Sequence, residues 1–145
     1  MLSSKNKEKI YIKCIESIKS TSESNKLKFI SKLLFESFDN WIFCGFYFQD
    51  NDKLFVSEYS ANKIPCSPIE FNGVCGTAIL KNKILNIEDV NNFQGHIVCD
   101  NDSKSELCIP FDIDGIKYVL DVDSNIYNAF CEIDKKYLVK IIKEF

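Results

Sequence analysis

Hydrophobic residues near both ends of the chain recur at the spacing of an amphipathic helix. The first group is Tyr11, Cys14, Ile15 and Ile18, and the second is Leu27, Ile30 and Leu34. The polar run 20–23 between them, with a serine three residues before a glutamate, is typical of a helix start. The same spacing returns at Leu138, Ile141, Ile142 and Phe145. The pattern predicts N-terminal helices within residues 1–38 and a C-terminal helix over residues 131–145.

The middle of the chain carries shorter apolar and aromatic runs separated by turn residues, a pattern that favours strands. The predicted strands cover residues 42–48, 54–59, 83–87, 106–111 and 116–122, and a short helix covers residues 74–80. Asp114 and Gly115, between the last two runs, are typical of the tight turn of a hairpin. We therefore expect an α+β fold, in which an antiparallel β-sheet is flanked by N-terminal and C-terminal helices.

Composition narrows the class of protein. At 145 residues the chain is expected to form a single domain, with the sheet and the active-site loops in residues 40–130. Eighteen basic residues against 21 acidic ones, with no basic tract, argue against a nucleic-acid partner. The longest apolar run, residues 41–48, is far short of the ~20 residues that span a bilayer. Because the start of the chain also lacks an apolar signal core, we expect a cytoplasmic protein with no membrane partner.

Seven cysteines change this picture, because their number is odd and no two of them form a CxxC pair. A zinc ribbon and a thioredoxin motif are therefore disfavoured, and some thiols are expected to be catalytic or metal-binding. Three cysteines lie in apolar segments and are predicted to be core residues: Cys14, Cys44 and Cys108. Cys131 begins the last predicted helix and has no evident role. This leaves Cys66, Cys75 and Cys99 as candidates for chemistry.

Residues 95–106, GHIVCDNDSKSE, form a polar loop that holds Cys99, three acids and His96, the only histidine of the chain. A cysteine near a histidine can be an activated nucleophile, but an ordinary solvated turn and a metal site are also compatible with this composition. A calcium loop is excluded, because counting from Asp100 the required glycine and glutamate positions hold Ser105 and Phe111.

Two carboxylates come at the end of the strand IKYVLDVD. Side chains alternate along a strand, so Val119, Asp121 and Asp123 are predicted to share one face. A face that turns from apolar to doubly acidic suits the binding of an ammonium group or a metal. A polar cap before the turn at residues 124–125 would produce the same pattern.

The blocks GVCGTA (73–78), Asp89-Val90, GHIVCD followed by SKSE (95–106) and LDVDS (120–124) occur in a characteristic order. In this order and spacing, residues 40–145 resemble the free methionine-(R)-sulfoxide reductases, enzymes built on a GAF domain. The resemblance implies a GAF-like fold. It also implies reduction of free L-methionine-(R)-sulfoxide by thiols, without a cofactor.

The resemblance also assigns roles to individual residues. Cys99 matches the nucleophile, and Cys66 and Cys75 match the cysteines of the recycling disulfide, with Cys66 preferred as the resolving thiol. The pocket is implied to be lined by Glu106, Asp121, Asp123 and Tyr47. Two stretches depart from the family pattern. Phe43 stands where the family has tryptophan, and the glycine-rich approach to the first cysteine is replaced by SEYSANKIPC. Trp41 lies two residues before Phe43, and strand alternation predicts that both contribute to an aromatic wall.

The mechanism implied by the resemblance explains why a thiol stands among acids. Clustered carboxylates repel one another's charge, so one of them, Glu106 foremost, can keep the proton that the sulfoxide oxygen needs. Cys99 would become a sulfenic acid, a second cysteine would convert it to a disulfide, and thioredoxin would reduce that disulfide. Asp121 and Asp123 would hold the substrate's free ammonium group, while His96, Lys104 or a helix N-terminus are candidates for lowering the pKa of Cys99.

Two other functions compete with this interpretation. A non-catalytic GAF module would bind a small ligand or sense oxidants. A thiol-bound metal site would use Cys66, Cys75, Cys99 and His96. A homodimer through the N-terminal helices is a further hypothesis.

Overall fold

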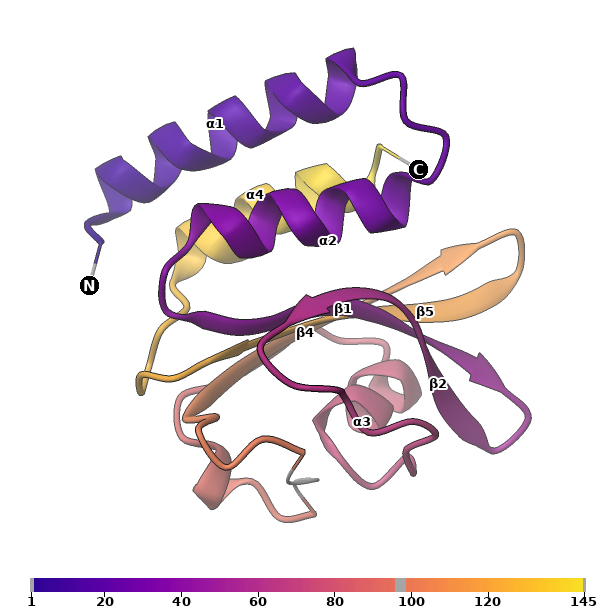
Figure 1. Ribbon diagram of the computed structural model, residues 1–145. Coiled ribbons are helices and arrows are strands. Elements are labelled where there is room, and N and C mark those ends of the chain that lie inside the picture. The colour runs from indigo at the N-terminus through magenta and orange to yellow at the C-terminus, as the bar shows by residue number, and fades with distance from the viewer. Residues whose placement is uncertain (1, 96–98, 145) are drawn as a thin grey trace.

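A five-stranded antiparallel sheet in the order β2-β1-β5-β4-β3 forms the centre of the molecule (Figure 1). The computed structural model describes residues 2–95 and 99–144. The strands are β1 (Trp41–Asp50), β2 (Lys53–Ala61), β3 (Leu85–Ile87), β4 (Ser105–Ile113) and β5 (Ile116–Ser124). Asp114 and Gly115 connect β4 to β5 with positive φ angles of 51° and 81°, as the predicted hairpin turn requires.

Helices cover both faces of this sheet, which confirms the α+β prediction. On one side of the sheet lie α2 (Lys26–Ser37) and α4 (Glu132–Ile142), with α1 (Ser4–Ser20) packed outside them, while α3 (Val74–Lys81) and the long connections cover the other face (Figure 1). A 3₁₀ turn (Val90–Asn92) precedes the polar loop. Each helix of the described residues is too short or too polar to cross a bilayer.

The start of α2 differs from the prediction. The helix begins after Asn25, whose side-chain oxygen accepts a hydrogen bond from the backbone amide of Lys28 at 3.1 Å. Thr21, from the polar run expected to cap α2, instead ends α1. An asparagine side chain satisfies the first free amides of a helix as well as serine does, so the capping residue lies two positions beyond the end of the expected run.

A buried ionic network joins the two chain ends on the helical face. The Lys7 ammonium lies 2.7 Å from the Asp134 carboxylate and also donates to the carbonyl of Ala129 at 2.8 Å. The Tyr11 hydroxyl donates to the other oxygen of Asp134 at 2.6 Å. Asp134 is fully buried, so these partners compensate for the water that its carboxylate has lost. Removing Asp134 would leave the buried Lys7 ammonium without a carboxylate partner.

The N-terminal end of β1 contradicts the prediction that Trp41 and Phe43 share a face. The pairing of β1 with β5 shifts register between these two residues, which breaks the strict alternation of side chains. Trp41 consequently packs in the helical-face core, with its ring 4.4 Å from Phe38 and 5.9 Å from Phe130. Phe43 packs in the core on the α3 face, beside Tyr47.

Candidate active site

A pocket opens on the α3 face of the sheet and is partly open to solvent. Its floor comes from β1, β4 and β5, its walls from the start of α3 and from the loops that precede α3 and β4. Among the predicted site residues, those that line it are Phe43, Tyr47, Cys75, Cys99, Glu106, Asp121 and Asp123. Trp41 is excluded by the register shift described above. The pocket therefore brings together predicted site residues from β1, α3, β4 and β5 and from the loop before β4.

Strand pairing explains why three carboxylates meet on the pocket floor. Glu106 on β4 lies directly opposite Asp123 on β5, and Asp121 lies two residues before Asp123 on the same face of that strand. Glu106 and Asp121 are buried, and Asp123 is partly buried. The predicted shared face of Asp121 and Asp123 is confirmed. We call Glu106, Asp121 and Asp123 the acidic cluster.

The surroundings of the acidic cluster favour protonated carboxyl groups. Burial, followed by the charges of Asp121 and Asp123, raises the pKa of Glu106 well above its usual range. Burial and the charge of Asp121 raise the pKa of Asp123 in the same direction. Oδ1 of Asp123 is buried and has no hydrogen-bond partner among residues 2–95 and 99–144. The pocket floor can therefore both donate a proton and accept hydrogen bonds from a ligand.

A pair of thiols lies directly against the acidic cluster. The Sγ atoms of Cys75, from α3, and Cys108, from β4, are 3.4 Å apart. We call these two residues the thiol pair. Burial raises the pKa of Cys108, and it raises that of Cys75 to about 12 even though the hydrogen bond with Cys108 lowers it. Neither thiol is therefore suited to be a thiolate nucleophile at neutral pH in this state.

Cys108 was predicted to be a core residue only, and the structure confirms that it is fully buried. Its contacts with Glu106 and Asp121, at 3.5 Å each, were not foreseen. Strand alternation could have predicted the contact with Glu106, because Glu106 and Cys108 are two residues apart on one strand and so face the same side of the sheet.

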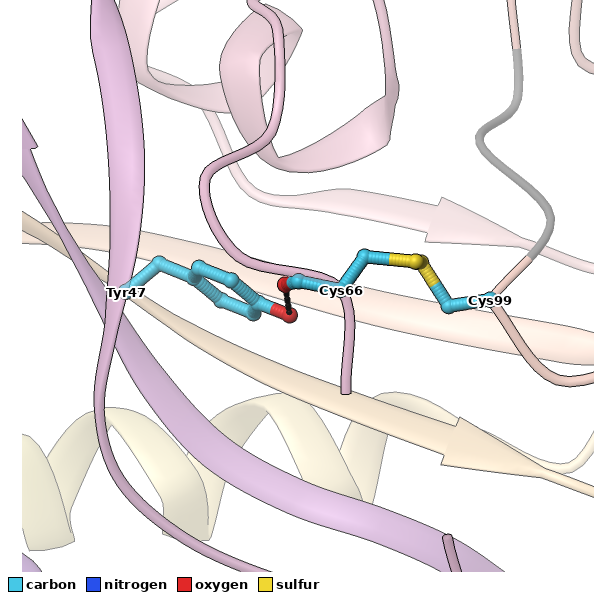
Figure 2. Close-up of a disulfide and its surroundings, with 3 residues drawn as sticks. All are labelled: Tyr47, Cys66 and Cys99. Atoms are coloured by element: carbon cyan, nitrogen blue, oxygen red, sulfur yellow. Dashed lines mark hydrogen bonds between the residues drawn. A yellow bond between two sulfur atoms is a disulfide. The ribbon is translucent and has the colours of Figure 1, made fainter. Parts of the chain in front are cut away.

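Cys66 and Cys99 form a disulfide at the pocket, with Cα atoms 5.7 Å apart (Figure 2). The Tyr47 side chain points toward this bridge, and its hydroxyl donates a hydrogen bond to the carbonyl of Cys66 at 2.9 Å (Figure 2). The Cα separation lies within the ordinary range for disulfides. The backbone spacing of these two cysteines is therefore compatible with a disulfide.

Charged side chains contact the residues that follow Cys99. The ammonium of Lys63 lies 3.2 Å from Asp100, and Asp100 also accepts a hydrogen bond from the amide of Asp102 at 2.9 Å. Lys104, a candidate for lowering the pKa of Cys99, instead lies with its ammonium 5.5 Å from the ring centre of Tyr127. His96, the other side-chain candidate, lies outside the described residues.

The chain is similar to known proteins in both sequence and structure. No family model matches the chain. It is 44% identical to "Protein YtsP" of Bacillus subtilis over 115 residues, which cover 76% of this chain and 69% of that protein. It is 37% identical to the free methionine-R-sulfoxide reductase of Escherichia coli over 116 residues, which cover 79% of this chain and 70% of that enzyme.

Two solved structures extend the likeness to the whole fold. The free methionine-R-sulfoxide reductase of Neisseria meningitidis, solved in complex with its substrate, superposes with a TM-score of 0.84 at 29% identity. The match covers 99% of this chain and 89% of that one. A structure described as a GAF domain superposes with a TM-score of 0.85 at 30% identity and the same coverage. The GAF-like fold expected from the sequence is therefore confirmed.

Proposed function

Because the chain belongs to the free methionine-R-sulfoxide reductase family, we propose that it reduces free L-methionine-(R)-sulfoxide to L-methionine in the pocket described above. The observation that carries this proposal is the Cys66–Cys99 disulfide beside a floor of buried carboxyl groups. A sulfoxide reductase needs a thiol nucleophile and a proton donor in the same small space. The E. coli and N. meningitidis proteins to which the chain is similar carry this activity in their names.

Glu106 serves as the acid in the first step. Its raised pKa supports a protonated carboxyl, which donates to the sulfoxide oxygen and makes the substrate sulfur electrophilic. The Cys99 thiolate then attacks this sulfur, the sulfur–oxygen bond of the substrate breaks, the oxygen passes with the donated proton to Cys99 as a sulfenic acid, and methionine leaves. The Cys99 sulfur loses two electrons, and the substrate sulfur gains them.

Cys66 serves as the resolving thiol in the second step. Its sulfur attacks the sulfenic acid of Cys99, the oxygen leaves as water, and the disulfide of Figure 2 forms. Tyr47 supports this step by holding the backbone of Cys66 through its hydroxyl. Cys75 was the second candidate for the resolving thiol, but its sulfur contacts Cys108 and takes no part in the disulfide.

The acidic cluster also recognises the substrate's ammonium group. Oδ1 of Asp123 has no hydrogen-bond partner among the residues that the structure describes, so it is available to a cationic donor. Asp121 lies beside it, and Phe43 and Tyr47 offer an apolar wall for the thioether chain. A peptide-bonded methionine lacks this ammonium, which accounts for selectivity toward the free amino acid.

A dithiol protein such as thioredoxin closes the cycle by reducing the Cys66–Cys99 disulfide through thiol–disulfide exchange. All electrons then come from thiols, so the reaction needs no flavin, metal or nucleotide on the enzyme. A cytoplasmic setting, where dithiol reductants are maintained, fits this requirement. The homodimer suggested by the sequence stays a prediction.

The proposal is tested by NADPH consumption with thioredoxin and thioredoxin reductase. Free L-methionine-(R)-sulfoxide, its S epimer and N-acetylated R-sulfoxide are supplied in parallel. We expect rapid turnover of the free R form, a far slower residual rate on the N-acetylated R-sulfoxide, and no turnover of the S epimer. Cys99→Ser should abolish turnover, whereas Cys131→Ser, which removes a thiol at the start of α4, should not. If reduced wild-type protein turned over none of the three substrates, a non-catalytic ligand-binding GAF module would be the better interpretation.

A further inference from the structure

The thiol pair has no task in the proposed reaction, although it touches the acidic cluster. Four potential metal-ligating atoms, from Cys75, Cys108, Glu106 and Asp121, all lie within 4.8 Å of one another, and all four residues are buried. We propose that they form a site for a thiophilic divalent cation, with zinc as the favoured ion, and that its occupation blocks the pocket. The proposal has a binding half, that these residues bind zinc, and a blocking half, that bound zinc inhibits the reductase. The blocking half rests on the proposed function, whereas the binding half does not depend on it.

The distances between these atoms match those of a tetrahedral zinc site. Zinc–sulfur bonds of about 2.3 Å and zinc–oxygen bonds of about 2.1 Å, at tetrahedral angles, separate ligand atoms by roughly 3.4–3.8 Å. The sulfur atoms of the thiol pair are 3.4 Å apart, and Cys108 Sγ lies 3.5 Å from an oxygen of Glu106 and 3.5 Å from an oxygen of Asp121. Cys75 Sγ lies 4.0 Å from the same Glu106 oxygen. Small side-chain shifts would therefore complete the coordination.

The donor set identifies the class of ion. Two sulfur and two carboxylate ligands suit zinc, whereas calcium and magnesium take oxygen ligands alone. The ligands come from α3, β4 and β5, so their arrangement is fixed by the packing of this helix on the sheet. An entry path exists as well, since Cys75, Glu106 and Asp121 line the open pocket while Cys108 lies beneath them.

Occupation of this site would compete with the substrate. Zinc would take up Glu106 and Asp121, which we assign to the proton donation and ammonium binding of the reductase. The Cys66–Cys99 disulfide uses neither thiol of the pair. The site can therefore form in both the reduced and the oxidised enzyme.

Cobalt titration of a Cys66→Ser/Cys99→Ser protein, kept reduced with a phosphine, tests the binding half without the catalytic thiols. We expect one cobalt per chain, with the visible bands of tetrahedral Co²⁺ and a thiolate charge-transfer band. Adding Cys108→Ser should remove these bands and weaken zinc binding by more than about tenfold. Adding Cys131→Ser should preserve both. Absent bands in the parent protein, or bands unchanged by Cys108→Ser, would overturn the site.

Two further measurements guard against a variant that fails to fold. Cys75→Ser should reproduce the loss of cobalt binding from the α3 side. X-ray absorption of the zinc-loaded parent should show two sulfur scatterers, and any other number would refute the ligand set.

The blocking half is tested in the thioredoxin assay with wild-type enzyme. Zinc should inhibit competitively with the sulfoxide, and a chelator should reverse the inhibition. Cys108→Ser should be at least about tenfold less sensitive to zinc, relative to its own zinc-free rate. Equal sensitivity would mean that zinc acts through Cys66 and Cys99. If the wild type showed no turnover at all, the proposed function would fail while the cobalt titration still decided the metal site.

Discussion

Asp123→Asn separates substrate recognition from the rest of the chemistry. The change keeps the size and shape of the side chain but removes one acceptor and the negative charge that the Asp123 carboxylate carries when the ammonium group is bound. The affected oxygen, Oδ1, is buried without a hydrogen-bond partner among the described residues, so no protein contact is lost there. In our proposal this oxygen accepts from the substrate's ammonium group, and the variant should therefore be impaired only toward substrates that carry one.

The expected loss follows from the energy of one charged hydrogen bond. Such a bond contributes about 1.5–3 kcal/mol, and 1.4 kcal/mol corresponds to a factor of ten. We therefore expect kcat/KM for the free R-sulfoxide to fall about 10- to 150-fold. The N-acetylated R-sulfoxide presents no ammonium, so its residual rate should stay the same or rise. The ratio of kcat/KM for the free R-sulfoxide to kcat/KM for the N-acetylated R-sulfoxide should therefore fall by at least the same factor.

The assay is the thioredoxin-coupled one, with kcat/KM measured for both substrates in the wild type and in Asp123→Asn. Zinc inhibition serves as an internal control, because Asp123 is not among the four proposed metal ligands and the variant should stay sensitive. An equal fall for both substrates would refute the ammonium role and point to a general disturbance of the pocket.

Three further predictions test the acid, the fold and the resolving step. The acidic cluster and the thiol pair surround Glu106, whose pKa is raised. With a chelator present, kcat/KM of the wild type should decline as the pH rises through this pKa, because Glu106 then loses the proton that it donates. Glu106→Gln should lower turnover roughly 100-fold or more and abolish that decline in a pH–rate profile. Lys7→Met should reduce the free energy of unfolding in urea by about 3–5 kcal/mol, because it breaks a buried ion pair. Lys19→Met, which removes an exposed pair at 3.9 Å, should change it by less than about 1 kcal/mol. Tyr47→Phe should cost about 1 kcal/mol of stability and slow disulfide formation by Cys66, measured as thiols remaining after a single turnover.

Local patterns predicted most of the elements and part of the site. The alternation over residues 119–123 placed both β5 aspartates on one face, because strand geometry alone determines where successive side chains point. The Asp114-Gly115 turn was equally local, since its residues tolerate the required positive φ angles. The family resemblance directed attention to Cys66 and Cys99, and the structure joins these two cysteines.

Other features depended on contacts between segments far apart in the chain. The register shift that turns Trp41 toward the helices exists only in the pairing of β1 with β5. Cys75 and Cys108 are separated by 33 residues, and they meet because α3 packs on the face of β4 that carries Glu106. Periodicity reports the direction of a side chain relative to its own element. Which side chains meet across elements is decided by strand register and helix packing, and these are properties of the assembled core.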